Sequence, residues 1–207
     1  MNKKLIIIGG GGHARSIYGL LQNNNLLKRL IGYSDFKKSN LPIKYLGNDE
    51  KICNLYSNNK VELILGIGIN VLLREKIIKK FKKYSFFTLV DKNAIVLKGT
   101  KIGYGSIIFP NAMISSNVEI KNYNVIHNSA VIEHDVKIGQ NSYIGPAAVI
   151  CGNAIVGKNV LLGANSTMIQ DTVIGDNCKL GAGSVLIKPC RIKNKILIGS
   201  PAKINKK

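Results

Sequence analysis

The sequence predicts two parts of different fold class, a small α/β domain at the N-terminus and a parallel β-helix after it. Two observations carry this prediction. Strand patterns alternate with helix patterns up to Asp91, and from Ile102 to Ile192 an aliphatic residue or methionine returns at every sixth position. Alternating strands and helices imply a parallel sheet. Hexapeptide periodicity is the sequence sign of a β-helix, whose coils bury their inner faces only by stacking.

The α/β part reads as alternating strands and helices joined by short loops. The expected elements are a strand over 3–8, a helix up to 23–25, a strand over 30–33, a loop or hairpin over 41–47, a helix over 49–55, a strand over 62–67, a helix over 70–84 and a strand over 86–90. Asn70 is the expected N-cap of the last helix, because its side chain can accept a backbone N–H there.

The repeat carries a second register beside the aliphatic one. Four places after nearly every aliphatic residue stands a small or short one, as at Ala112, Ala130 and Ser142. We expect the aliphatic side chains to point inward and Gly, Asn or Asp to take the corners, where positive φ is needed.

The amino-acid composition limits which classes of partner the protein is expected to have. Lys and Arg number 30 against 11 Asp and Glu, for a formal net charge of +19. The lysines are spread over both parts without a nucleic-acid-binding signature, so we expect solvated lysines rather than a nucleic-acid-binding face. The alternative is attraction of anionic small molecules or of an anionic membrane surface. No apolar run approaches the roughly 18 residues of a membrane span, and the run Leu5–Ile8 is too short for a signal peptide. We therefore expect a cytoplasmic protein without stable membrane insertion.

The turn after the first strand has the pattern of a phosphate-binding loop. Gly9 to Ala14 satisfies G-x-G-x-x-A between a strand and a helix, and Asp35 follows further on. Glycines let the backbone approach a phosphate, and the helix N-terminus offers unpaired N–H groups. The domain is long enough for one mononucleotide half, so a nucleotide or nucleotide-sugar phosphate is preferred to NAD. A glycine turn without a ligand is the alternative.

The repeat contains one strong candidate for a general base. His134 stands between Glu133 and Asp135, and a nearby carboxylate favours the imidazolium formed after proton uptake. His127 is the weaker candidate, and a solvated corner histidine is the alternative for either. A zinc site would need a further ligand nearby. The four cysteines form no C-x-x-C pair, so we expect reduced thiols and no metal.

Three stretches together resemble a known family. Residues 6–14 (IIIGGGGHA), 129–135 (SAVIEHD) and 198–203 (IGSPAK), with the uninterrupted hexads between, are similar to the left-handed β-helix sugar acyltransferases. Within that family they look like the bacterial nucleotide-sugar N-acetyltransferases of the acetylbacillosamine-forming and perosamine types, and like the sialic acid O-acetyltransferases.

The resemblance implies a fold, partners and site residues. The fold is an α/β Rossmann-like half domain (1–91), a left-handed parallel β-helix of hexapeptide repeats (92–192) and a tail that completes the coenzyme A site (193–207), assembled as a homotrimer. His134 is the implied general base and Glu133 the carboxylate that orients it. The implied substrate-binding residues are Gly10, Gly11, Gly12, His13, Asp35, Phe36, Lys37, Gly68, Asn70, Arg74 and Asn128. The implied acetyl-CoA-binding residues are Tyr143, Gly145, Gly163, Ala164, Pro201 and Lys203.

The sequence departs from the family pattern at two positions. Tyr143 stands where some close members carry a second histidine, and its hydroxyl could donate to the acetyl carbonyl. Asp91 stands where many relatives have a histidine at the domain junction, and we expect it to be structural.

The expected function is acetyl-CoA-dependent N-acetylation of a nucleotide-linked 4-amino-4,6-dideoxy sugar in glycan biosynthesis, with UDP as the first choice of nucleotide. We expect direct transfer, because no cysteine or serine forms a motif with His134 that would suggest an acyl-enzyme. The alternatives are O-acetylation of sialic acid or another sugar, and a non-catalytic β-helix protein that only binds a nucleotide sugar.

Overall fold

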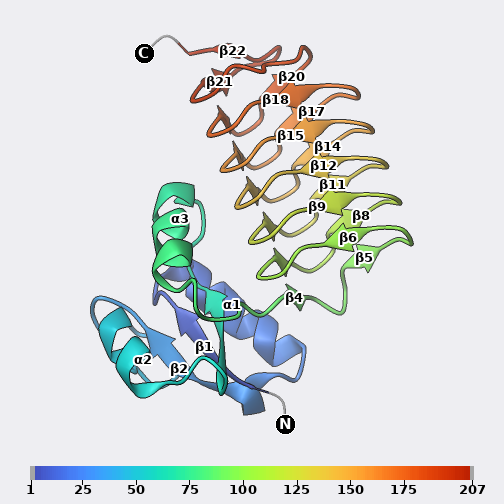
Figure 1. Cartoon of the computed structure of the whole chain (residues 1–207). Coiled ribbons are helices and arrows are strands. Elements are labelled where there is room, and N and C mark those ends of the chain that lie inside the picture. Colours follow the sequence, from blue (N-terminus) through green and yellow to red (C-terminus); the bar gives the residue numbers. More distant parts are fainter. Residues whose placement is uncertain (1–2, 206–207) are drawn as a thin grey trace. The chain divides into compact units, whose positions relative to one another are not determined.

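The computed structural model describes residues 3–205, and the chain divides into two compact units between Thr88 and Leu89 (Figure 1). The first unit is built on a parallel sheet in the order β2-β1-β3. Its strands are β1 (Lys4–Ile8), β2 (Leu30–Ser34) and β3 (Val61–Leu65), and its helices are α1 (Gly12–Asn23), the 3₁₀ turn η1 (Leu27–Arg29), α2 (Asp49–Leu55) and α3 (Val71–Lys80). Residues 5–8 of the central strand are all buried, as expected for a strand covered on both faces.

The first unit confirms the predicted α/β half domain and corrects two of its boundaries. Asn70 caps α3, since its Oδ1 accepts from the backbone N of Leu73 at 3.0 Å. The helix ends at Lys80 instead of residue 84, because the chain turns there and buries Phe81. The predicted strand over 86–90 is split: Phe86 makes an isolated bridge with Leu63, whereas the next paired residues belong to the second unit.

The second unit is a left-handed parallel β-helix whose three faces are three sheets of two- and three-residue strands (Figure 1). The first face contains β4 (Leu89–Val90), β7 (Ile107–Ile108), β10 (Val125–Ile126), β13 (Tyr143–Ile144), β16 (Leu161–Leu162), β19 (Lys179–Leu180), β21 (Ile196–Ile198) and β22 (Lys203–Ile204). The second contains β5 (Ile95–Val96), β8 (Met113–Ile114), β11 (Val131–Ile132), β14 (Val149–Ile150), β17 (Thr167–Met168) and β20 (Val185–Leu186). The third contains β6 (Lys101–Ile102), β9 (Glu119–Ile120), β12 (Lys137–Ile138), β15 (Ile155–Val156) and β18 (Val173–Ile174).

The two registers of the repeat are confirmed as the core of this unit. The residues at every sixth position from Ile108 to Leu186 are at most 2% exposed. The small residues of the second register, such as Ala130 and Ser142, are buried as well. The corners recur at positive φ every sixth residue, from Asn111 to Asn177. Asn and Asp tolerate this conformation better than other residues with a side chain, which explains their frequency at the corners.

The prediction that the aliphatic register continues to Ile192 is wrong. Ile192 is 57% exposed, and Cys190 and Leu197 lie in the core instead. The chain leaves the hexad register here because Cys190 pairs with Ile174. At the start of the unit, Asp91 is buried and its Oδ1 accepts from the backbone N of Asn93 at 2.9 Å.

A ladder of asparagine side chains runs along one corner of the β-helix. Asn141 Nδ2 donates to Asn159 Oδ1 at 2.8 Å, and Asn159 Nδ2 donates to Asn177 Oδ1 at 3.0 Å. The three residues stand at the same place in successive coils, so each amide satisfies the next.

Asn159→Ala should lower the free energy of unfolding by about 1–3 kcal/mol, because it removes the hydrogen bonds that the buried Asn159 amide makes to both neighbours of the ladder. The matched control is Asn165→Ala, which removes an exposed asparagine at the same kind of positive-φ corner. Urea unfolding of both variants measures the difference. Equal losses would mean that the corner conformation matters and the ladder does not.

Candidate active site

The glycine turn of the first unit is tied to the end of β2 through one carboxylate. Gly10 N donates to Asp35 Oδ2 at 2.6 Å, and Phe36 N donates to Asp35 Oδ1 at 2.6 Å. A side chain at Gly10 would not fit, since an added Cβ would lie 2.7 Å from Tyr33 Cε2 and 2.9 Å from Ser39 Oγ. Asp35 therefore holds the turn in place, and its contact with the turn is to backbone nitrogen.

A basic cavity of about 500 Å³ opens beside this turn. Its lining residues are Gly10, Gly11, Arg15, Asp35, Phe36, Lys37, Lys38, Ser39 and Asn40. Helix α1 begins here with Gly11 as N-cap, no side chain caps it, and no acidic residue stands in its first turn. Uncapped N–H groups, the positive end of the helix dipole and three cationic side chains favour a phosphate. Arg15 and Lys38 were absent from the sequence prediction, although their charge and position beside the turn are visible in the sequence.

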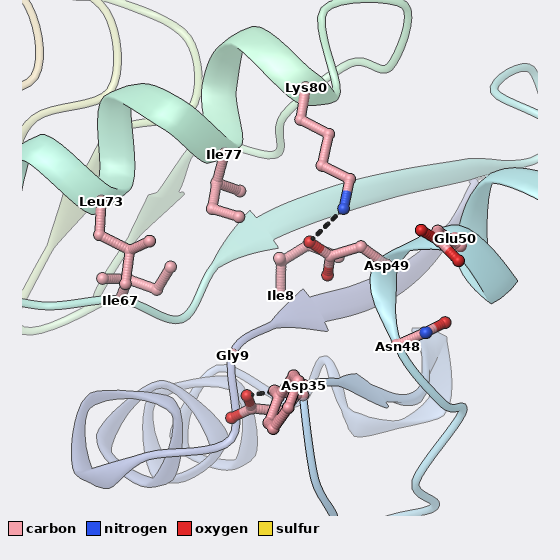
Figure 2. Close-up of a pocket in the computed structure, with 11 residues that line it drawn as sticks. Ile8, Gly9, Asp35, Asn48, Asp49, Glu50, Ile67, Leu73, Ile77 and Lys80 are labelled. Carbon is pink, nitrogen blue, oxygen red and sulfur yellow. Dashed lines mark hydrogen bonds and ion pairs between the residues drawn. The ribbon is translucent and has the colours of Figure 1, made fainter.

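A second cavity, of about 420 Å³, lies against the carboxyl ends of β1 and β3. Figure 2 shows Ile67, Leu73 and Ile77 on one side of it and Asn48, Asp49 and Glu50 on the other. Asp35 and Phe36 line both cavities, so the two adjoin.

Five residues of this unit that the sequence predicts to bind substrate line neither of these cavities. Gly12 opens α1, and Asn70 uses its side-chain oxygen as the N-cap of α3. His13 packs on Gly68, where an added Cβ would lie 3.2 Å from its Cγ. Arg74 is fully buried and its Nη1 donates to Ile67 O at 3.0 Å. In this unit Asn70, Arg74 and the His13–Gly68 contact shape the loop after β3.

The candidate base of the second unit, His134, is hydrogen-bonded to a neighbouring carboxylate. His134 Nδ1 lies 2.9 Å from Asp135 Oδ2, and both side chains are about half exposed, at 56% and 48%. The carboxylate in contact with the imidazole is thus that of Asp135, whereas Glu133 acts electrostatically on Cys151, whose thiol pKa is raised by burial and by this carboxylate. The orienting role predicted for Glu133 stays a prediction.

Gly152 supports the imidazole from the next coil. A Cβ at this position would lie 2.7 Å from both Cε1 and Nε2 of His134. The imidazole ring therefore packs directly against the backbone of Gly152, and any side chain at position 152 would displace the ring. Sequence reasoning missed Gly152, although it stands eighteen residues, three hexads, after His134.

A polar cavity of about 400 Å³ adjoins Asp135 on the same unit. Its lining residues are Asn117, Glu119, Asp135, Lys137, Asn153 and Ile155. These side chains come from successive coils and offer both hydrogen-bond donors and acceptors around Asp135.

His127 is held in a different environment. Its ring stacks on Phe109 with centroids 4.3 Å apart, and its Nδ1 accepts from the backbone N of Asn128 at 3.0 Å. Burial lowers the pKa of His127, so the neutral imidazole is favoured. Tyr143 is buried, with its ring 5.8 Å from that of His127.

The residues predicted to bind acetyl-CoA lie on the later coils and the tail. A Cβ at Gly145 would meet Leu162 O at 2.7 Å, and one at Gly163 would meet Ala182 N at 2.5 Å. These glycines therefore let adjacent coils stack closely. Lys203 pairs with Ile198 across the antiparallel strands β21 and β22, and Pro201 lies in the turn between them.

Between residues 3 and 205, no three His, Cys, Asp or Glu side chains gather as a metal would require. No helix in that range is both long and apolar enough to span a bilayer.

Sequence comparisons assign a family to each part of the chain. Residues 4–81 match the PglD N-terminal domain, residues 135–170 the bacterial transferase hexapeptide, and residues 153–188 the hexapeptide repeat of succinyl-transferase. The sequence has no significant match among curated proteins. The protein is thus an acyltransferase of the hexapeptide-repeat class. More narrowly, its two parts together resemble the sugar acyltransferases in which hexapeptide repeats follow a PglD-type N-terminal domain.

Solved structures resemble the whole chain. Perosamine N-acetyltransferase from Caulobacter crescentus, in complex with CoA and GDP-perosamine, is 27% identical, with a TM-score of 0.90 over 99% of this chain and 98% of that one. A mutant of that enzyme with the same ligands is 25% identical, with a TM-score of 0.92 over 100% and 99%. The acetyltransferase domain of PglB from Neisseria gonorrhoeae, 22% identical with a TM-score of 0.92 over 99% and 100%, shares the fold.

Proposed function

We propose that this protein transfers the acetyl group of acetyl-CoA to the amino group of a nucleotide-linked 4-amino-4,6-dideoxy sugar. The observation that carries the proposal is the His134–Asp135 pair, with its imidazole resting on Gly152. The similarity to perosamine N-acetyltransferase, solved with CoA and GDP-perosamine, supports both ligands. The basic cavity at Gly10 and Gly11 supports a nucleotide phosphate.

The proposed reaction is direct transfer. The sugar amine attacks the thioester carbonyl, and His134 Nε2 takes the proton from the amine nitrogen. A backbone N–H of the coil stabilises the oxyanion. Collapse of the tetrahedral intermediate forms the amide and breaks the C–S bond, and the proton on His134 passes to the departing thiolate. The hydrogen bond to Asp135 holds Nδ1 in its protonated form, so that Nε2 is the basic nitrogen.

The other predicted residues take part in this proposal as binding groups. Gly10, Gly11 and Lys37 hold the nucleotide phosphates, and Asn128 lies near the acceptor amine. Gly145, Gly163, Ala164, Pro201 and Lys203 line the coenzyme site, and the Tyr143 hydroxyl donates to the acetyl carbonyl.

The proposed assembly is a cytoplasmic homotrimer. Apolar side chains of the β-helix that are exposed in the single chain, Ile95 and Tyr104 at 55% each and Ile155 at 42%, offer an interface. Light scattering of the purified protein tests the trimer, and a monomer mass would contradict it.

A thiol-release assay tests the reaction. The protein is mixed with acetyl-CoA and, separately, with GDP-, UDP- and dTDP-linked 4-amino sugars and with free sialic acid. Release that depends on an amino sugar, with an acetamide product, supports the proposal. Release only with sialic acid supports O-acetylation, and no release with any acceptor supports a binding protein without transferase activity.

Gly152→Ala should lower kcat about 10- to 100-fold, because the new Cβ displaces the imidazole and small misplacements of a reacting group are costly. The matched control is Gly19→Ala on α1, where an added Cβ meets nothing within 4 Å, and it should retain wild-type turnover. Steady-state assays measure the turnover of both variants, and thermal melts show whether each variant is folded, so that displacement of His134 can be distinguished from unfolding. Unchanged kcat in Gly152→Ala would contradict this placement of His134.

A further inference from the structure

We propose that the nucleotide bound by the α/β unit carries guanine, and that Glu50 recognises it. This inference rests on the proposed function, because it names the base of the nucleotide-linked sugar. It concerns the cavity of about 420 Å³ at the carboxyl ends of β1 and β3, which is called the base cavity below.

The base cavity is in the right place for the base of a nucleotide. Open parallel sheets bind ligands outside the carboxyl ends of their strands, where the strand order reverses. With the order β2-β1-β3, that point lies beside β1, and the cavity is lined there by Gly9 and Ile67. It shares Asp35 and Phe36 with the phosphate cavity. A nucleotide with its phosphates at the glycine turn therefore reaches the base cavity with its base.

The wall formed by α3 and the loop before it suits a flat aromatic ring. Ile67, Leu73 and Ile77 line one side of the cavity (Figure 2). The Phe36 side chain at its edge is 93% exposed, so its ring is available to stack on a base, an interaction that any base can make. This wall accounts for affinity and does not distinguish one base from another.

Three carboxylates line the base cavity, those of Asp35, Asp49 and Glu50, and two of them are already engaged. Asp35 accepts from two backbone N–H groups. Asp49 Oδ1 accepts from Ser34 Oγ at 2.9 Å, and its Oδ2 pairs with Lys80 at 3.1 Å. Within residues 3–205, no hydrogen bond or ion pair engages the carboxylate of Glu50, which lines the cavity beside Asp49. Glu50 is therefore the acceptor left for a ligand.

Asn48 supplies a donor on the same rim. Its Oδ1 accepts from the backbone N of Lys51 at 3.1 Å as the N-cap of α2. With the oxygen engaged there, the side chain presents its NH₂ group, which only donates. The rim thus offers one amide donor, at Asn48, and one carboxylate acceptor, two residues further along the chain at Glu50.

This pair of groups matches the edge of guanine better than that of any other base. Guanine presents two adjacent donors, N1–H and the 2-amino group, beside the acceptor O6. A carboxylate can accept both donors in a bidentate, charge-assisted pair, and the Asn48 amide can donate to O6. Uracil and thymine present one N–H between two carbonyl oxygens, which a carboxylate would repel. Cytosine and adenine present one amino group beside a ring nitrogen acceptor. The base cavity therefore favours GDP over UDP, although the sequence by itself favours UDP.

Calorimetric titration of the full chain with nucleoside diphosphates tests the inference. GDP should bind at least about tenfold more tightly than UDP or CDP, and about tenfold more tightly than IDP, which lacks the 2-amino group. Glu50→Gln should weaken GDP binding about tenfold and remove the preference for GDP over IDP. The matched control Glu75→Gln, on α3 where Glu75 pairs with Lys79 and lines neither cavity, should keep both.

The outcomes separate this inference from the proposed function. UDP or CDP binding as tight as GDP, or a GDP-over-IDP preference that survives Glu50→Gln, overturns the base assignment, even if amino-sugar acetylation proceeds. A Glu50-dependent preference for GDP supports the base assignment, even if a GDP-linked amino sugar gives no thiol release. If none of the diphosphates binds, both proposals fail. Thermal melts of the two variants confirm that they are folded.

Discussion

His134→Ala should lower turnover about 100-fold or more, since general base catalysis typically contributes a factor of that size. The dissociation constant of coenzyme A should stay nearly unchanged, because the imidazole acts on the amine proton. The turnover of Asp135→Asn should lie between those of His134→Ala and the wild type. The amide can still contact Nδ1 of His134, but it no longer stabilises the imidazolium that forms. Steady-state kinetics with a nucleotide-linked amino sugar measures both variants.

His127→Asn is the matched control for this prediction. His127 stacks on Phe109, and burial lowers its pKa, so it should contribute to packing and little to turnover. Assays well below the melting temperature of each variant keep the folded fraction equal. Wild-type-like turnover in His134→Ala would sink the assignment of the base, and a loss confined to His127→Asn would move that role to His127.

Ile144→Ala should lower the free energy of unfolding by about 2–5 kcal/mol, the usual cost of truncating a buried isoleucine. Ile144 is fully buried in the middle of the β-helix, where β13 pairs with strands of the coils on both sides. The same substitution at Ile192, which is 57% exposed, should change stability by less than about 0.5 kcal/mol. Urea unfolding followed by circular dichroism compares them.

The pair of variants tests the register of the coil. By sequence spacing alone, Ile144 and Ile192 occupy the same position of the hexad. On that basis, both alanine substitutions would lower the free energy of unfolding by the same amount. The structure ends the register after Leu186 and places Cys190 and Leu197 in the core. Equal losses in the two variants would show that the last coil continues the hexads.

Part of the site could be predicted because it depends on neighbours in the chain. The glycine turn is recognisable because a strand, a run of glycines and a helix follow one another directly. His134 stands out because histidine is rare in this chain, and Asp135 is its immediate neighbour. Gly152 and Glu50 could not be selected by the same reasoning. One acts through a contact between coils, and the other through the absence of a partner around its carboxylate among the described residues.

The sequence by itself determined the parallel β-helix, predicted from Ile102 to Ile192 and confirmed in the core from Ile108 to Leu186, the α/β half domain before it and the base candidate His134. Those features repeat at fixed spacing or lie in one short stretch, so local geometry dictates them. Only the tertiary structure decided that Asp135 contacts the imidazole, that Arg74 is buried behind the loop it supports and that Ile192 lies outside the core. Those outcomes depend on which segments meet in space and on which polar groups find partners there, and residue spacing alone does not contain that information.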